Sequence, residues 1–299
     1  MAIQYVQAPF RVLDAVSPRL GARLALRFFT TPRRWPVPAW EQAIAQSAER
    51  IWLANGHTGF SWGRGRPVLL VHGWEGRVTQ LGRFVEPLVA AGFRVIGFDA
   101  PAHGTHRGKA LTVLGYAQFL RMVAAEFGPL HGVIAHSMGA SALGFAAQRP
   151  LRVGRAVLIS IARSVGGVAQ RFENLLALGP RTRALFRRRL EAEVFGTPLA
   201  ELDLCRNVPA YLPPTLLLAT DDDRDMPVED TQEIAAHWPK ARMQIALKAG
   251  GHRKVLRDWR VIDAAVRFLT EAAWLPRPLE PQALTAANAP APATTQAHR

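Results

Sequence analysis

Short apolar runs alternate with helical stretches along the middle of the chain. The apolar runs span 60–62, 68–71, 94–98, 132–135, 156–159, 215–218 and 243–247. Continuous apolar runs of this length are typical of strands that are buried on both faces. Helical patterns lie between them, at about 79–91, 111–127, 138–148, 229–237 and 255–273. This alternation predicts an α/β fold, with a mostly parallel sheet and helices on both faces.

The pattern changes on either side of the sheet region and once inside it. Residues 1–57 predict an N-terminal helical extension, with a second helix over 39–54 after a Pro-rich break. The sheet domain is expected over 58–275, with a helical cap inserted at about 164–214, where no convincing strand occurs. Residues 276–299 are rich in Pro and Ala and predict a disordered tail.

The basic helix expected over 17–29 is amphipathic. Its start is marked by Ser17-Pro18, with Ser as the cap and Pro in the first turn. Two neighbouring stripes follow every four residues: Leu20, Leu24 and Phe28, beside Arg19, Arg23 and Arg27. Such a helix can lie on an anionic membrane or pack against its own domain, and the sequence leaves both possibilities open.

The net charge of +14 indicates a polyanionic partner at first sight, but the composition weakens this interpretation. The excess is almost entirely Arg in a chain rich in Ala, Pro and Gly, which a GC-rich coding sequence produces without a polyanionic partner. A hydrophobic content of 49% excludes a disordered chain. A single cysteine, Cys205, and no pattern typical of a signal peptide predict a cytoplasmic protein, with peripheral membrane contact through the helix 17–29 left open.

Three chemically reactive side chains follow predicted strands. Ser137 lies in the run Ala-His-Ser-Met-Gly (135–139), where a buried strand meets a helix and a strained elbow needs small residues two positions to either side. The acidic run 221–225 and the segment Gly-Gly-His at 250–252 also follow strands. The order is Ser, Asp, His, and each lies just past the carboxyl end of a strand, where open parallel sheets form their sites.

These motifs resemble the α/β-hydrolase superfamily over about residues 58–273. The resemblance is strongest to uncharacterised bacterial serine hydrolases with Thr-Pro-Arg-Arg at 31–34, His-Gly-Trp-Glu-Gly-Arg at 72–77 and Gly-His-Arg-Lys-Val-Leu-Arg-Asp at 251–258. The sequence is also similar to the serine aminopeptidase and monoglyceride-lipase-like group. The resemblance implies a serine hydrolase that works by acyl transfer.

The resemblance also implies the catalytic roles. Ser137 would be the nucleophile and His252 the general base, because a serine hydroxyl needs a base within reach and the base needs an orienting acid. The family places its acid four residues before the Pro of a Val-Pro pair, which selects Asp223 here. Asp221 is the second choice and Asp225 the third, and the unused acids of this loop are expected to be solvated.

The resemblance assigns the oxyanion hole to two backbone amides. The residue after the nucleophile, Met138, supplies one, and Trp74 supplies the other. His72 is expected to hold the oxyanion loop, and Gly73 and Gly139 to support the close packing around it.

Two readings of the function remain open in the sequence. The first is a carboxylic-ester hydrolase on a small or medium apolar acyl substrate, with thioesters and amides as further possibilities. The second is a non-catalytic binding module on a hydrolase fold, which would dock an anionic membrane or nucleic acid through arginines. We expect the first, with a small-molecule ester-type substrate, no nucleic-acid partner and no cofactor. We also expect no metal, because His103 and His106 lack a third ligand at useful spacing.

Overall fold

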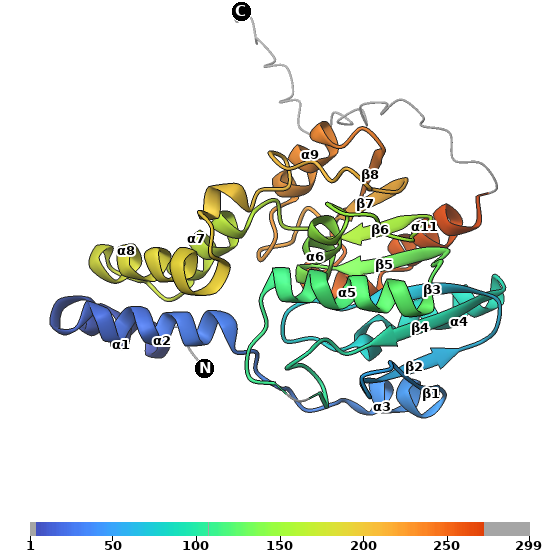
Figure 1. The fold of residues 1–299 in the computed structure, drawn as a ribbon, viewed down its shortest axis with the longest axis horizontal. Helices are drawn as coiled ribbons and strands as arrows, with labels where there is room; N and C mark the ends of the chain where they lie inside the picture. Colours follow the sequence, from blue (N-terminus) through green and yellow to red (C-terminus); the bar gives the residue numbers. More distant parts are fainter. Residues whose placement is uncertain (1–3, 107, 272–299) are drawn as a thin grey trace, which may run out of the picture.

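In the residues that the structure describes, the fold is built around a single twisted sheet of eight strands (Figure 1). The computed structural model describes residues 4–106 and 108–271. The strands are β1 (Glu49–Trp52), β2 (Thr58–Trp62), β3 (Arg66–Val71), β4 (Phe93–Phe98), β5 (Gly132–His136), β6 (Ala156–Ile159), β7 (Thr215–Ala219) and β8 (Ala241–Ile245). Their order is β1-β2-β4-β3-β5-β6-β7-β8, in which β3 to β8 are parallel and β2 pairs antiparallel with both β4 and β1. The predicted α/β fold is therefore confirmed.

The order in which successive strands are added to the sheet reverses at β3. It passes from β3 to β4 on one side and then returns to β5 on the other. Loops that leave the carboxyl ends of β3 and β5 therefore diverge and open a crevice between them. This topology fixes where a site can form before any side chain is considered.

Helices cover both faces of the sheet. The helices of the described residues are α1 (Gln4–Val16), α2 (Pro18–Thr30), α3 (Ala39–Gln46), α4 (Val85–Ala90), α5 (Val113–Phe127), α6 (Met138–Ala146), α7 (Val165–Leu175), α8 (Pro180–Arg189), α9 (Val228–His237), α10 (Gly251–Lys254) and α11 (Trp259–Thr270). Leu69 and Val71 of β3 join the apolar core that includes α5, α6 and α9, whereas Val68 and Leu70 join the core that includes α4 and α11. Alternate side chains of β3 therefore pack into two apolar cores, one on each face of the sheet.

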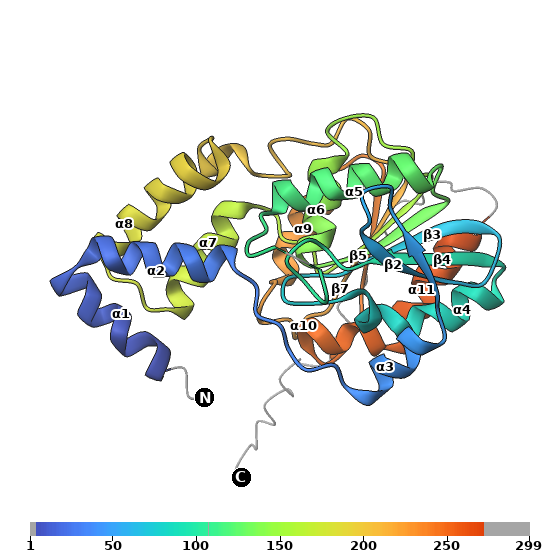
Figure 2. The ribbon, with the colours of Figure 1, turned by 60° about the horizontal axis from the view of Figure 1, so that its bottom comes forward.

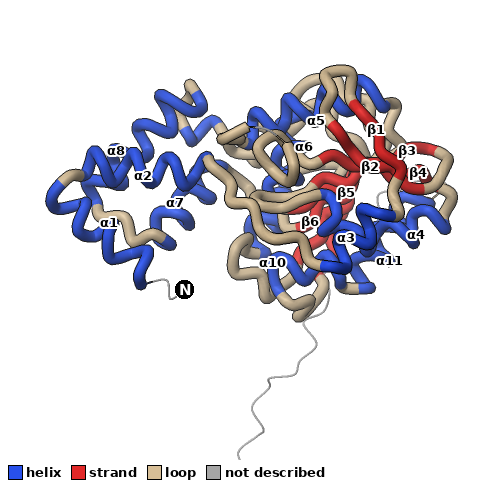
Figure 3. Tube along the Cα trace, turned by 90° about the horizontal axis from the view of Figure 1, so that it is seen from below, coloured by secondary structure: helices blue, strands red, loops and turns tan. Residues whose placement is uncertain are grey.

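The N-terminal helices and the cap helices form one layer beside the sheet (Figures 2 and 3). Helix α2 packs against α8, and α1 packs against both. Phe29 of α2 meets Phe172 of α7 and Phe186 of α8 edge to face, with ring centroids 5.2 and 5.7 Å apart. Two segments far apart in sequence, 4–30 and 164–214, therefore build this layer together.

The helix expected over 39–54 is wrong beyond Gln46. The chain turns there and enters β1, which pairs antiparallel with β2. The hairpin turn contains Asn55-Gly56, and Gly56 has a positive φ of 80°. An Asn-Gly pair between two strands is a strong hairpin signal, and it explains why strand pairing prevails over the helical pattern.

Three further expectations concern the ends of the chain and contact with a membrane. Helix α2 begins at Pro18 as predicted, but the Ser17 side chain makes no capping hydrogen bond. No described helix is long and apolar enough to cross a membrane. The tail expected over 276–299 lies outside the described residues.

Candidate active site

Ser137 lies at the sharp turn between β5 and α6. Its φ of 55° is in the left-handed region, which a residue with a side chain adopts only under constraint. A β-carbon added to Gly139 would stand 2.4 Å from the His72 carbonyl oxygen, so the helix can approach the end of β3 only with glycine there. The turn places the hydroxyl at the carboxyl edge of the sheet, at the crevice that the topology opens.

His252 lies in the loop that follows β8. Gly250 and Gly251 before it have φ values of 89° and 78°. Both of their amides donate hydrogen bonds of 3.0 Å to the Asp222 carboxylate. The Lys248 amide binds Asp221 at 2.6 Å. These two acids, which we expected to be merely solvated, fix the backbone that carries His252.

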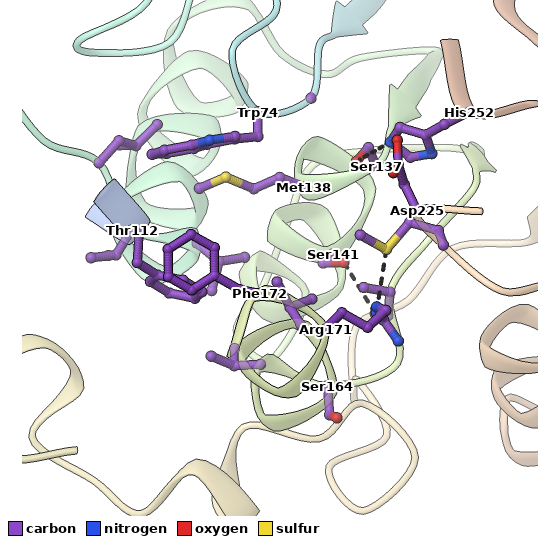
Figure 4. A pocket seen from close by; sticks show the side chains of 18 of the residues that line it. Trp74, Thr112, Ser137, Met138, Ser141, Ser164, Arg171, Phe172, Asp225 and His252 are labelled. Carbon is purple, nitrogen blue, oxygen red and sulfur yellow. Dashed lines mark hydrogen bonds between the residues drawn. The ribbon is translucent and has the colours of Figure 1, made fainter. Parts of the chain in front are cut away.

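Ser137, His252 and Asp223 form a continuous chain of hydrogen bonds (Figure 4). The Ser137 hydroxyl lies 2.9 Å from Nε2 of His252, and Nδ1 of His252 lies 2.8 Å from Oδ2 of Asp223. The structure thus brings together the three residues that the sequence singles out. Asp221 and Asp225, the second and third choices for the acid, make no hydrogen bond to His252 within the described part of the chain.

The protonation of Asp223 determines the tautomer of His252. Burial alone raises the pKa of this carboxyl, but the hydrogen bond and charge of His252 and the Met226 amide outweigh it, so the pKa lies below its ordinary value. The amides of Asp225 and Met226 bind the other oxygen, Oδ1, at 2.9 and 2.8 Å. An ionised Asp223 can only accept, so Nδ1 of His252 donates to it. Nε2 of a neutral ring is then free to accept the Ser137 proton.

The amides of Trp74 and Met138 are in the positions expected of an oxyanion hole. Met138 opens α6, and Trp74 follows Gly73 in the loop after β3. Neither amide donates a hydrogen bond to another described residue. A β-carbon on Gly73 would meet the Ser137 β-carbon at 2.8 Å, so glycine lets the two loops meet. Two free N–H groups beside a serine nucleophile can stabilise a tetrahedral oxyanion.

His72 holds the oxyanion loop rather than taking part in proton transfer. Its Nδ1 donates to the Gly73 carbonyl at 2.8 Å, and its Nε2 accepts from the Ala100 amide at 2.9 Å. The Tyr116 hydroxyl donates to the His72 carbonyl at 3.1 Å. Burial is the main cause that lowers the pKa of His72 to about 4. The ring is therefore neutral and ties the ends of β3 and β4 together.

His136, directly before the nucleophile, plays a part that motif reading misses. Its Nε2 donates to the His252 carbonyl at 2.8 Å, and the two rings lie with centroids 4.7 Å apart. Burial lowers the pKa of His136 to about 3, with the neighbouring His252 as a second cause. A neutral His136 thus links the elbow to the loop of the base. The interaction spans 116 positions of sequence, and no local pattern predicts it.

The three motifs that carry the family resemblance meet around the oxyanion loop. Glu75 accepts hydrogen bonds from the side chains of Arg33 and Trp35, at 3.0 and 2.9 Å. Arg77 donates to the Trp35 and Pro36 carbonyls at 2.9 and 3.0 Å. The N-terminal segment 31–41 therefore lies across this loop as a strap.

The end of the strap is held by charge. Arg77 pairs with Glu41 at 2.6 Å, and their side chains are only 10% and 3% exposed. Thr79 donates to the same oxygen of Glu41 at 2.7 Å. From the third motif, the Arg257 guanidinium lies 4.5 Å from the ring of Trp40. These contacts of the motif residues thus hold the loops that carry Trp74 and His252.

A mostly apolar cavity of about 580 Å³ ends at Ser137 and His252 (Figure 4). Its apolar lining includes Phe29, Trp74, Met138, Phe145, Val168 and Phe172. The wall therefore combines the sheet domain, the cap segment and α2. The sequence did not predict that α2 lines the cavity, because the residue pattern of α2 does not indicate the surface against which the helix packs.

Most ligand atoms of the two candidate metal clusters already make hydrogen bonds. The His103 and His106 rings bind backbone groups: His103 accepts from the Glu75 amide, and His106 donates to the Thr58 carbonyl at 2.9 Å. Among the described residues, Asp223, Asp225 and His252 place ligand atoms within 4.8 Å of one another. Two of these three side chains are already engaged in the hydrogen-bond chain to Ser137.

The reversed parallel sheet and the strained serine at its strand-to-helix turn define the α/β-hydrolase class. A family model described as the alpha/beta hydrolase family matches residues 68–268, and the chain belongs to this family. A serine hydrolase-like protein of Danio rerio is 33% identical over 154 residues, which are 47% of this chain and 43% of that protein. The chain thus spans less than half the length of this curated relative.

Solved structures agree on the fold. An esterase from Pyrococcus furiosus superposes with a TM-score of 0.57 at 18% identity, over 80% of this chain and 95% of that one. An esterase from Exiguobacterium antarcticum superposes with a TM-score of 0.53 at 15% identity, over 75% and 100% of the two chains. At such identities the likeness concerns the fold alone.

Proposed function

We propose that the protein is a serine hydrolase that cleaves carboxylic esters of small or medium apolar acyl groups. One observation carries the proposal: the hydrogen-bonded chain from Ser137 through His252 to Asp223 ends at the floor of a mostly apolar cavity. A binding module would not need an activated serine there. Thioesters and amides use the same chemistry and remain in the substrate class to be tested.

The mechanism follows from the hydrogen-bond directions. The Ser137 oxygen attacks the ester carbonyl while its proton passes to Nε2 of His252. The carbonyl oxygen becomes an oxyanion that accepts from the amides of Trp74 and Met138. Asp223 stabilises the imidazolium that forms, without taking its proton. His252 then protonates the leaving alcohol, and a water activated by the same base hydrolyses the acyl-enzyme.

The cavity supports an apolar acyl group rather than a charged one. Its lining around Ser137 is largely aromatic and aliphatic, and burial of each methylene of a substrate chain contributes roughly 0.8 kcal/mol. Arg171, the cationic side chain that Figure 4 labels in this wall, is paired with Asp230 at 3.0 Å. Most of the cavity wall thus offers an acyl chain apolar contacts. A cytoplasmic location belongs to the same proposal.

A fluorophosphonate probe, which forms a covalent bond with an activated serine, tests the nucleophile. We expect labelling of the native protein and none of Ser137→Ala. Ser141→Ala is the matched control, because Ser141 also lines the cavity but its hydroxyl donates to the Ala162 carbonyl at 3.1 Å. Labelling that persists in Ser137→Ala, or that disappears in Ser141→Ala alone, would exclude Ser137 as the nucleophile.

A series of p-nitrophenyl esters of increasing chain length tests the substrate class, with a thioester and an aminopeptidase substrate beside it. We expect kcat/KM to rise from acetate toward medium chains as the cavity fills, and then to fall. A background-level profile across all esters would contradict the esterase proposal even if Ser137 is labelled.

A further inference from the structure

Helix α1 exposes an apolar stripe to solvent. Tyr5, Val12 and Val16 are 78%, 61% and 72% exposed. Their spacings of seven and four residues place them on one side of the helix. Phe10, on another side, is buried and meets Phe28 of α2 edge to face. The helix therefore has an inner apolar side for its own domain and an outer one that no described residue covers.

Helix α2 repeats this arrangement. Its buried positions are the small residues Gly21, Ala22 and Ala25, whereas Leu20 and Phe28 remain 45% and 50% exposed. The domain thus packs on the small-residue side of α2 and on Leu24, Leu26 and Phe29, and it leaves Leu20 and half of Phe28 exposed.

The free sides of the two helices face the same way. In α1, Asp14 accepts a 2.6 Å hydrogen bond from the Thr182 amide of α8. In α2, a β-carbon on Gly21 would stand 3.0 Å from Thr182. Val12 and Val16 lie across α1 from Asp14, and Leu20 lies away from the buried side of α2. The α1 stripe and Leu20 therefore face away from α8, which lies on the opposite side of the helix pair (Figure 1).

Arginines accompany this apolar face. Arg19, Arg23 and Arg27 are exposed, and none of them pairs with an acid in the described part of the chain. Each precedes a member of the apolar stripe by one residue, so the two stripes are neighbours on α2. Arg23 and Arg27 also line a hollow of about 310 Å³. Unpaired guanidinium groups suit phosphate oxygens.

The inner side of the helix pair reaches the rim of the cavity at Ser137. Phe28 and Leu175 are each about half exposed, and both line the cavity that ends at Ser137. The Gln7 side chain, on the inner side of α1 that also carries Asp14, donates to the Leu175 carbonyl at 3.0 Å and holds α1 at the cavity rim.

We propose that α1 and α2 dock the protein on the surface of an anionic phospholipid bilayer. The apolar stripes would enter the region between headgroups and acyl chains, and the arginines would contact lipid phosphates. Binding to the bilayer does not depend on the proposed function.

Co-sedimentation of the full chain with vesicles tests the docking. We expect at least tenfold tighter binding to phosphatidylglycerol vesicles than to phosphatidylcholine vesicles, with at least tenfold weakening between 0.05 and 0.5 M NaCl. The variant Val12→Gln/Val16→Gln/Leu20→Gln should lose at least tenfold in affinity. The variant Arg23→Gln/Arg27→Gln should weaken binding and flatten its dependence on salt.

Controls separate docking from misfolding and from catalysis. Leu247→Gln and Trp259→Ser alter side chains that are 59% and 74% exposed outside α1 and α2, and they should bind as the native chain does. The docking variants should keep the native circular dichroism and thermal midpoint. Ser137→Ala should bind vesicles fully, so a failure of the proposed hydrolase activity would not imitate a failure of docking.

Two results would overturn the proposal. One is the absence of binding to phosphatidylglycerol vesicles at low salt. The other is equal binding to vesicles and duplex DNA that the triple Gln variant leaves unchanged, which would indicate a general polyanion surface without apolar insertion.

Discussion

Three buried histidines at the carboxyl edge of the sheet stay neutral, and this has a consequence for stability. Burial is the main cause that lowers the pKa of His72 and His103 to about 4 and that of His136 to about 3. The unfolded chain protonates histidine near 6.5. Between pH 6.5 and 4 the unfolded state therefore binds more protons than the folded state, so stability falls as the pH falls.

We expect the free energy of unfolding to decrease steadily from pH 7 to about 4, with up to about 3 kcal/mol from each of these histidines. Asp99, whose pKa burial raises, acts in the opposite sense but is one group against three. Urea unfolding at several pH values measures the effect. His136→Asn should flatten the slope by about 1.4 kcal/mol per pH unit, whereas the exposed His237→Gln should not. A slope unchanged by His136→Asn would contradict the prediction.

At the same scale, the sequence predicts the proposed catalytic residues better than the residues that hold them in position. Ser137 and His252 could be located because a strained elbow and a strand-end Gly-Gly-His leave local signatures. Asp223 could be selected only through its distance from a proline. His136 and Asp222 could not be predicted, because their hydrogen bonds hold backbone groups of the His252 loop, far away in sequence.

At the scale of elements, the strap 31–41 is held by the buried pair of Arg77 and Glu41. Removal of one partner leaves a buried charge without compensation, which typically costs about 3–5 kcal/mol. We therefore expect Glu41→Ala to lower the free energy of unfolding by that amount, measured by urea denaturation.

The exposed pair of Arg267 and Asp263 provides the control for this strap variant. It lies within one helix, and its side chains are 69% and 49% exposed. Asp263→Ala should change stability by no more than about 0.5 kcal/mol. Similar losses in Glu41→Ala and Asp263→Ala would mean that the strap is not fixed by the buried pair.

The regular elements themselves follow from the sequence wherever periodicity is strong. The five apolar runs that became β3 to β7 are buried from water on both faces, so their pattern leaves no other assignment. The strand β1 differs because only Ile51 of its four residues is even partly buried. Its pairing with β2 depends on the turn at Asn55-Gly56, which outweighs the helical pattern of 39–54.

At the scale of the whole molecule, the domain division drawn from the sequence separates what the fold joins. Residues 4–30 of the expected extension and the cap expected at 164–214 share one layer, and their contact helps to shape the cavity at Ser137. The contact depends on Gly21, Ala22 and Ala25 of α2. Small residues do not indicate which element packs against them. The sequence could therefore predict helix α2 but not its position in the fold.

Ala25 offers a direct test of this joint layer. It is fully buried on the side of α2 that packs on α8. Ala25→Leu adds three carbons to a packed contact, which typically costs about 1–3 kcal/mol. The strain should push α2 outward and displace Phe28 and Phe29 from the cavity wall. We expect KM to rise several-fold for a p-nitrophenyl octanoate and to stay unchanged for the acetate, because only the longer chain reaches that wall.

The matched control is Ala236→Leu, an exposed position on α9 away from the cavity lining. It should leave both the stability and the chain-length profile as they are. If Ala25→Leu lowers stability by 1 kcal/mol or more and the octanoate KM stays native, α2 does not form the acyl wall. If instead KM rises equally for both esters, the displaced helix disturbs the catalytic centre itself, because an effect on the wall alone must grow with the length of the acyl chain.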